Sequence, residues 1–202
     1  MSSQIIVSFD IGVKNLAVCV IEYNPSDLNI LVWKIISLAA PKEKIPIMNE
    51  LAGRLFLELD TLVDEIGQPI DFVILENQPS NLNGSMKSLQ MMIYTYFQLR
   101  KHWEGLSKQV YLVSASEKLK GHETITDTLD MTKYQTMKRY EKNKKLGVEI
   151  TKNYLSKTPE ILTYFCSYKK ADDMADSFLQ AISWLKKHNV SIENISMSSK
   201  TI

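Results

Sequence analysis

Two acidic residues stand where their carboxylates could share one chemical task. Asp10 comes shortly after the apolar, β-branched run Ile5-Ile6-Val7, and Glu76 is the last residue of the largely apolar run DFVILE (71–76). If these runs are neighbouring strands of one sheet, both carboxylates converge at the edge where sites gather in α/β proteins. Each residue alone also has an ordinary explanation, because an Asp often closes a turn and a Glu often reaches solvent from a strand end.

Further acidic residues lie in the segment KKADDMADSFLQAISWLKKH (169–188), whose apolar residues recur at helical spacing. On a helix, Asp176 is a neighbour of both Asp172 and Asp173, because residues three and four positions apart lie on one face. Acidic side chains near a helix N-terminus also favour the helix dipole, which is a purely structural explanation. Spacing alone does not decide between Asp172 and Asp173.

Acidic side chains gathered in one pocket would repel one another, and bound cations relieve that repulsion. Hard oxygen ligands suit Mg²⁺, and two such ions roughly 4 Å apart suit in-line phosphodiester hydrolysis. Zinc is not indicated, because the three histidines are scattered and no cysteines are spaced as ligands. The acids therefore predict a two-metal phosphodiester hydrolase.

The glycines exclude several nucleotide-binding classes. All seven are isolated, whereas Walker A and Rossmann loops need clustered glycines. The pattern D-x-G-x-x-N at 10–15 also resembles the phosphate hairpin of actin-type ATPases, but no second glycine-bearing hairpin follows. A Ser-His-Asp hydrolase would need an exposed serine elbow, and none is found.

The elements that must position these residues are alternating strands and helices. Apolar runs predict strands at 5–7, 16–21, 30–38, 71–76 and 110–114, and helical periodicity predicts helices at 48–66, 87–103 and 169–188. The first three strands form an antiparallel meander, and the short apolar run at 71–76 suits a strand buried on both faces. The predicted fold is α/β, with a mixed five-stranded sheet flanked by helices.

A basic segment interrupts this pattern. From Lys133 to Lys157, eight basic residues against two acidic ones give +6, so with a net charge of +1 the other 177 residues sum to −5. Three interleaved tyrosines strengthen the interpretation as a phosphate-backbone contact, with a solvated helix face as the alternative. We predict one nuclease domain at 1–188, with 119–157 as a DNA-gripping segment, and a poorly ordered tail at 189–202.

Composition sets the remaining limits. The 202 residues are 45% apolar and 23% charged, as in an ordinary globular domain. Cys19 and Cys166 lie among apolar residues and fit reduced core positions of an intracellular protein. The first strand starts within a few residues of Met1, so we expect neither a signal peptide nor a membrane span.

The order of these motifs resembles the RuvC-type Holliday junction resolvases of poxviruses and other large DNA viruses. The resemblance rests on FDIGVKNLA, ILENQPS with NGSMKSLQMMIYTYF, VSASEKLK, NKKLGVEITKNYL and KKADDMADSFLQA, and it spans nearly the whole chain. It implies a ribonuclease H-like fold and a homodimeric endonuclease that resolves four-way DNA junctions by paired symmetric nicks. It also implies two Mg²⁺ ions per site, replaceable by Mn²⁺, no small-molecule cofactor, and action at viral replication sites in the infected-cell cytoplasm.

Carried over position by position, the resemblance assigns roles to individual residues. It makes the metal ligands Asp10, Glu76, Asp173 and Asp176, and it prefers Asp173 to Asp172 because the family pattern is D-x-x-D followed by a small residue. It places a functional lysine at Lys118, with Lys120 as the alternative, while Lys145 resembles a second lysine of bacterial relatives. The lysines expected to contact DNA are Lys120, Lys142, Lys144 and Lys145. The long 119–144 segment departs from the family pattern, so the choice among lysines stays open.

Two other functions stay open. One is a protein of this fold that binds branched nucleic acid without cleaving it, which the full set of acids opposes; the other is an enzyme acting on RNA–DNA hybrids or flaps.

The helix from Lys87 to Trp103 carries surplus apolar side chains and is the predicted dimer face: Met91, Met92, Tyr94, Tyr96 and Phe97.

Overall fold

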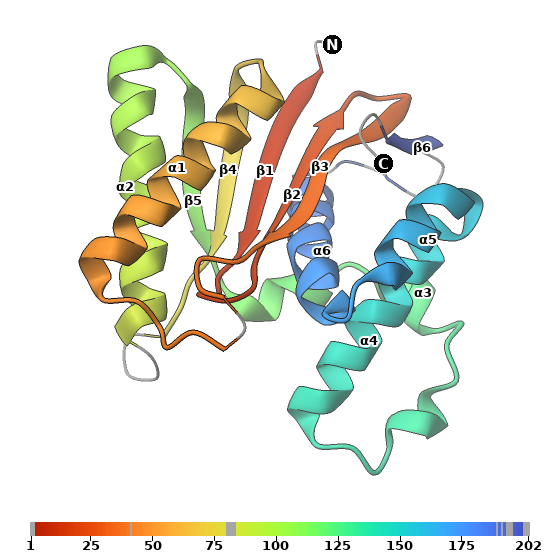
Figure 1. Cartoon of the computed structure of the whole chain (residues 1–202). Helices are drawn as coiled ribbons and strands as arrows, with labels where there is room; N and C mark the ends of the chain where they lie inside the picture. Colours follow the sequence, from red (N-terminus) through yellow and green to blue (C-terminus); the bar gives the residue numbers. More distant parts are fainter. Residues whose placement is uncertain are drawn as a thin grey trace.

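The computed structural model describes residues 3–40, 42–79, 84–188, 190, 192 and 196–199. Its centre is a mixed six-stranded sheet in the order β5-β4-β1-β2-β3-β6 (Figure 1). The strands are β1 Gln4–Asp10, β2 Leu16–Tyr23, β3 Asp27–Ile36, β4 Ile70–Glu76, β5 Ser107–Val113 and β6 Ser196–Ser199. β1, β2 and β3 form the predicted antiparallel meander, and β4 lies parallel to both β1 and β5.

Helices connect and cover these strands. The α-helices are α1 Met48–Ile66, α2 Gly84–Glu104, α3 Glu123–Thr126, α4 Arg139–Tyr154, α5 Pro159–Ser167 and α6 Ala171–Lys187. Three 3₁₀ helices lie between them: η1 Ala115–Leu119, η2 Met131–Tyr134 and η3 Leu155–Lys157. Gly67 ends α1 in the left-handed region at φ 62°, which glycine adopts without steric cost.

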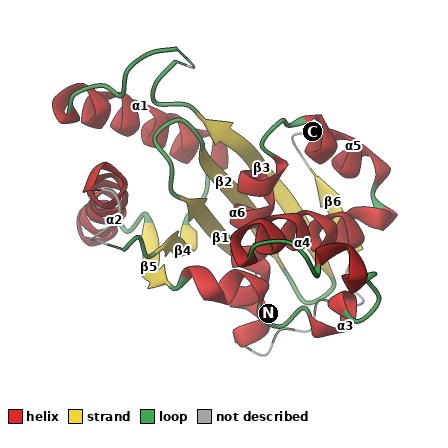
Figure 2. Cartoon of the chain, turned by 90° about the horizontal axis from the view of Figure 1, so that it is seen from below, coloured by secondary structure: helices red, strands yellow, loops and turns green. Residues whose placement is uncertain are grey.

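The sheet has a hydrophobic core on each face because strand side chains alternate between faces. In β1, Ile5, Val7 and Phe9 face one core, which also holds the apolar residues of α1 and α2. Ile6 faces the other core, which is closed by α4, α5 and α6. Figure 2 shows α1 and α2 on one side of the sheet and α4, α5 and α6 on the other. The predicted α/β fold, a mixed sheet flanked by helices, is therefore confirmed.

The sixth strand corrects the predicted five-stranded sheet and part of the predicted poorly ordered tail. Ser196–Ser199 pair in parallel with 27–30 of β3. This serine-rich segment has no apolar period, and its pairing uses backbone groups that every residue offers at a sheet edge. The rest of the predicted tail, apart from Val190 and the buried Ile192, lies outside the described residues.

Cys166 also differs from the prediction. Cys19 is a buried free thiol as expected, but Cys166 is exposed on α5. Phe165 beside it is fully buried, because neighbouring helical residues point about 100° apart and only one of them faces the core.

The polar segment after residue 119 folds against the rest of the domain. It forms α3, η2 and α4, and α4 packs on α6 with Gly147 at the interface. A Cβ at Gly147 would lie 3.6 Å from Leu179 and 3.7 Å from the Asp176 carboxylate, which are ordinary packing distances, so α4 and α6 approach closely here. None of the helices in the described ranges is long and apolar enough to cross a membrane.

Candidate active site

The ends of β1 and β4 bring two of the predicted carboxylates together. The two strands are parallel neighbours, and their register pairs Phe9 with Leu75. The next residues, Asp10 and Glu76, therefore leave the sheet at the same edge and the same height. Both side chains are only 13% exposed. Local strand patterns predicted each carboxylate, and the parallel register explains why they meet.

The first turns of α6 bring the other two acids to this edge. Asp173 and Asp176 line the same cavity as Asp10 and Glu76. Gln180, one turn after Asp176, holds the helix in place because its amide nitrogen donates to Ser8 Oγ at 3.0 Å and to the Phe9 and Ile74 carbonyls at 3.1 and 3.3 Å. Sequence reasoning missed Gln180, although a Gln within an otherwise apolar helix stripe was a usable signal.

Lys118 lies at the centre of the acidic group. Its ammonium nitrogen is 2.7 Å from Asp10 Oδ1, 2.7 Å from Glu76 Oε2 and 2.9 Å from Asp176 Oδ2. The side chain is 7% exposed, and η1 delivers it directly after β5. The alternative, Lys120, is instead 64% exposed and pairs with Glu117. The geometry therefore brings Lys118, and not Lys120, to the carboxylates.

A second cation approaches from α4. Lys144 pairs with Asp172 and lies 3.9 Å from Asp173 Oδ1. It lines the acidic cavity together with Tyr140, whereas Lys145 is absent from that lining and lines only a neighbouring cavity, which Lys144 also borders. Asp172 is thus engaged by Lys144, and Asp173 is the one of the pair that lines the acidic cavity. Lys142 lies on the same helix and is partly exposed.

The electrostatics of the cavity reflect crowded acids. Burial raises the pKa of Asp10 to about 7, with Lys118 opposing the rise and Glu76 adding to it. Burial, Asp172 and Asp10 together raise the pKa of Asp173 to about 6. Burial by itself would lower the pKa of Lys118, but Asp10, Asp176 and Glu76 raise it above its ordinary value. The ammonium therefore stays charged and offsets part of the carboxylate repulsion.

The donor set suits a hard divalent cation. Three carboxylate oxygens point at one position, now held by the Lys118 ammonium, and oxygen is the ligand that Mg²⁺ prefers. Among the described residues, no three His, Cys, Asp or Glu side chains are already arranged to hold an ion directly. A divalent cation held by Asp10, Glu76 and Asp176 would take the position of the Lys118 ammonium, so this side chain would have to move aside.

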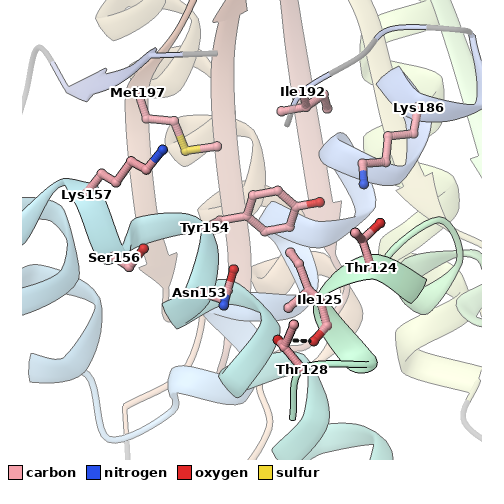
Figure 3. A pocket seen from close by; sticks show the side chains of 10 residues that line it. All are labelled: Thr124, Ile125, Thr128, Asn153, Tyr154, Ser156, Lys157, Lys186, Ile192 and Met197. Carbon is pink, nitrogen blue, oxygen red and sulfur yellow. Dashed lines mark hydrogen bonds between the residues drawn. The ribbon is translucent and has the colours of Figure 1, made fainter. Parts of the chain in front are cut away.

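The predicted acids line one cavity, and a second cavity lies apart from them. The acidic cavity has a volume of about 350 Å³ and is lined by residues of β1, β4, η1, α4 and α6. A second, of about 310 Å³, lies around Tyr154, Thr124 and Lys186 (Figure 3) and contains none of the predicted site residues. The sequence-predicted acids thus fall together in the first cavity.

Residues 4–116 match the family described as Poxvirus A22 protein. A protein of Acanthamoeba polyphaga mimivirus is 31% identical over 142 residues, which is 68% of this chain and 34% of that protein. The chain thus spans about a third of that relative's length. The family match includes Asp10 and Glu76 but ends before Lys118 and α6.

Three solved structures are similar over nearly the whole chain. The yeast mitochondrial Holliday junction resolvase Ydc2 is 20% identical with a TM-score of 0.62, covering 91% of this chain and 79% of its own. The fowlpox virus resolvase, solved with Holliday junction DNA, is 20% identical with a TM-score of 0.58, covering 92% and 99%. Thermus thermophilus RuvC on a Holliday junction substrate is 12% identical with a TM-score of 0.54, covering 93% and 98%. The predicted resemblance is confirmed: the chain belongs to the Poxvirus A22 protein family and has the fold of the RuvC-type resolvases.

Proposed function

We propose that this protein is a Mg²⁺-dependent endonuclease that resolves four-way DNA junctions by paired, symmetric nicks. The observation that carries the proposal is the meeting of Asp10, Glu76, Asp173 and Asp176 in one cavity of a Poxvirus A22 family chain. A protein that only bound branched DNA would not need this costly set of buried carboxylates. The likeness to resolvases solved on junction DNA supports the substrate class.

The four carboxylates would hold two Mg²⁺ ions, and Mn²⁺ has the same preference for oxygen ligands. Bound Mg²⁺ would supply the positive charge that activates water and stabilises the leaving oxygen in phosphodiester hydrolysis. The chain itself contributes the fixed positions of the acids at the strand ends. It also contributes the Lys118 ammonium, which is close enough to the acids to meet a phosphate oxygen bound beside them.

The basic residues of α4 complete the proposed DNA-binding surface. Lys144 and the 70% exposed Tyr140 stand at the mouth of the acidic cavity, and Lys142 and Lys145 lie on the same helix. Ammonium groups attract a phosphate backbone without sequence preference. Substrate would thus be drawn to the acids despite their negative charge.

A single site can cut one strand at a time, so symmetric resolution favours a two-fold dimer. The predicted face on α2 is only partly available, because Phe97 is buried and Tyr96 packs against the core, while Met91 is 40% exposed. Leu99 and Trp103 extend the exposed part at 44% and 73%. We propose that this face of α2 forms the dimer, and a monomer in sedimentation, both free and on the junction, would exclude it.

The deciding experiment is cleavage of a synthetic four-way junction by the purified protein with Mg²⁺. Linear duplex, RNA–DNA hybrid and flap substrates serve as controls, and Asp10→Asn serves as the inactive control. We expect paired nicks placed symmetrically about the branch point of the junction alone. Preferred cleavage of hybrid or flap would assign a different substrate, and tight junction binding without cleavage by the wild type would assign a binding protein.

We also propose that the protein acts where viral DNA is replicated in the infected cell, because the matched family is a poxvirus family. Replicating viral DNA is the source of branched intermediates on which such an enzyme would act. Co-localisation of the tagged protein with newly labelled viral DNA tests this, and a diffuse distribution would contradict it.

A further inference from the structure

A buried histidine stands directly behind the candidate active site. His122 has no exposed surface and follows η1, the element that delivers Lys118. Its Nε2 lies 3.2 Å from the Lys118 carbonyl oxygen and 3.0 Å from Ser183 Oγ. Its Nδ1 lies 3.0 Å from the Tyr154 hydroxyl. The imidazole therefore joins η1, α4 and α6 at one point.

The partners of His122 determine which ring nitrogen carries the proton. Burial and the neighbouring Lys186 lower its pKa to about 4, so the ring is neutral near pH 7. A backbone carbonyl only accepts, so the contact with the Lys118 carbonyl needs the proton on Nε2. Nδ1 then accepts from the Tyr154 hydroxyl, and the single Ser183 O–H donates to, or is shared between, the Lys118 and Lys120 carbonyls, both at 3.1 Å.

The same hydrogen bonds fix the backbone that carries Lys118. The carbonyls of Lys118, Lys120 and Gly121 accept hydrogen bonds from Ser183 or Lys186, both on α6. Ser183 lies two turns after Asp176, whose carboxylate contacts the Lys118 ammonium. One helix thus holds both the backbone of Lys118 and one of the carboxylates that its ammonium meets.

The outer end of this network reaches the second cavity. Figure 3 shows the Tyr154 ring in that cavity, with Lys186 and Thr124 around it. Lys186 Nζ lies 5.7 Å from the centre of the ring, and the His122 and Tyr154 rings meet edge to face at 5.6 Å. The hydroxyl of Tyr154 thus contacts His122 Nδ1, while Lys186 lies over its ring.

We propose that His122 is a positioning residue for Lys118: its Nε2–H, oriented by Tyr154, fixes the η1 backbone so that the ammonium reaches Asp10, Glu76 and Asp176. This inference rests on the proposed function only where Lys118 is taken to act on the scissile phosphate. Its structural part concerns the free protein, so it can be tested without metal or DNA.

The first experiment measures how fast an acylating reagent modifies Lys118 in metal-free, DNA-free protein, with mass spectrometry to read each lysine. His122→Ala should expose Lys118 and raise its modification rate about tenfold, because the η1 backbone that carries Lys118 loses about one stabilising hydrogen bond. His122→Gln should stay near wild type, because its amide nitrogen replaces Nε2–H as a donor. Lys34, paired with Glu65 on the far side of the sheet, is the internal control.

Two further variants protect the test against simple misfolding. Tyr154→Phe keeps the ring and removes only the hydroxyl, and it should raise Lys118 modification by less than His122→Ala does. His188→Gln is the matched control, because His188 bonds the Trp184 carbonyl on α6, away from the acids. Wild-type reactivity of Lys118 in folded His122→Ala would overturn the inference. If His122→Ala does not fold, unchanged reactivity in Tyr154→Phe would overturn it instead.

The second experiment is a double-mutant cycle on single-turnover junction cleavage. His122→Ala should lower the rate about tenfold with little change in junction affinity, and it should have no further effect in a Lys118→Ala background. Equal losses in both backgrounds would overturn the positioning role. If no form of the protein cleaves junctions, the proposed function fails, and the labelling experiment still decides the role of His122.

Discussion

The acidic and the cationic halves of the candidate site are held by different kinds of contact. Asp10 and Glu76 end two neighbouring parallel strands, and backbone hydrogen bonds set their relative height. Lys118 and Lys144 come from η1 and α4 and are held by ion pairs and by buried polar side chains such as His122. A strand ladder positions a residue whatever its side chain is, whereas the cations depend on particular partners. We therefore expect Lys118 and Lys144, more than Asp10 and Glu76, to move when metal or DNA binds.

Removing one carboxylate should have the largest effect on activity. Asp10→Asn, Glu76→Gln, Asp173→Asn and Asp176→Asn should each lower single-turnover junction cleavage by about 10²-fold or more, because a misplaced metal or water costs that much. Junction binding and the circular dichroism spectrum should change little, since each change keeps the side-chain size and leaves the backbone hydrogen bonds of the strands and of α6 intact.

The matched control for these variants is Asp172→Asn. Asp172 is adjacent to Asp173 but pairs with Lys144 and is not among the residues that line the acidic cavity. Its replacement should affect cleavage only weakly. An essential Asp172 and a dispensable Asp173 would show that α6 presents a different face to the substrate.

Lys118→Ala should have the next largest effect. Without its ammonium, charge developing on the phosphate has no fixed partner, which should lower the cleavage rate by roughly 10–10²-fold. Junction affinity should stay near the wild-type value, as measured by fluorescence anisotropy in Ca²⁺. A matched fall in affinity with an unchanged single-turnover rate would make Lys118 a DNA-anchoring residue instead.

The crowding of the acidic half should appear as a pH dependence of stability in EDTA. The pKa of Asp10 rises from 3.8 to about 7 on folding, so the folded protein binds more protons between these values. The free energy of unfolding therefore falls as pH rises through this window, by at most about 1.4 kcal/mol per pH unit.

Comparison with Asp10→Asn isolates this contribution. The pKa of His122 falls from 6.5 to about 4 on folding, which adds stability as pH rises, but this opposite term is present in both proteins. The free energy of unfolding from urea denaturation, taken as wild type minus Asp10→Asn, should thus decline from about pH 4 to pH 7. Parallel stability curves would contradict the raised pKa of Asp10.

Neutralising the basic face of α4 should have the smallest effect per residue. Changing Lys142, Lys144 and Lys145 to Gln should make the plot of log affinity for DNA against log salt concentration less steep, by about 0.9 for each phosphate that is no longer neutralised. For each such phosphate, the loss of affinity between 50 and 200 mM salt should become smaller by roughly threefold. Lys101→Gln and Lys108→Gln, on α2 and β5, provide controls for net charge. An unchanged slope would mean that α4 is only a solvated surface.

Much of the fold was predictable because its signals are local. The continuous apolar run of β1 predicted a buried strand, the helical period of α1 and α6 predicted which side of each helix is buried, and the structure confirms both. β6 was not predictable in this way. Its serines carry no apolar pattern, and its partner, β3, lies more than 160 residues earlier in the chain.

The sequence by itself determined the strand ends that carry Asp10 and Glu76 and the helix that carries Asp173 and Asp176. Only the tertiary structure decided which cations lie beside these acids: Lys118, which the resemblance favoured over Lys120, is 2.7 Å from Asp10, and Lys144 is 3.9 Å from Asp173. The physical reason is that hydrophobic periodicity tells which face of an element is buried. It does not tell which side chain of a distant segment stands opposite, since that depends on how the elements pack.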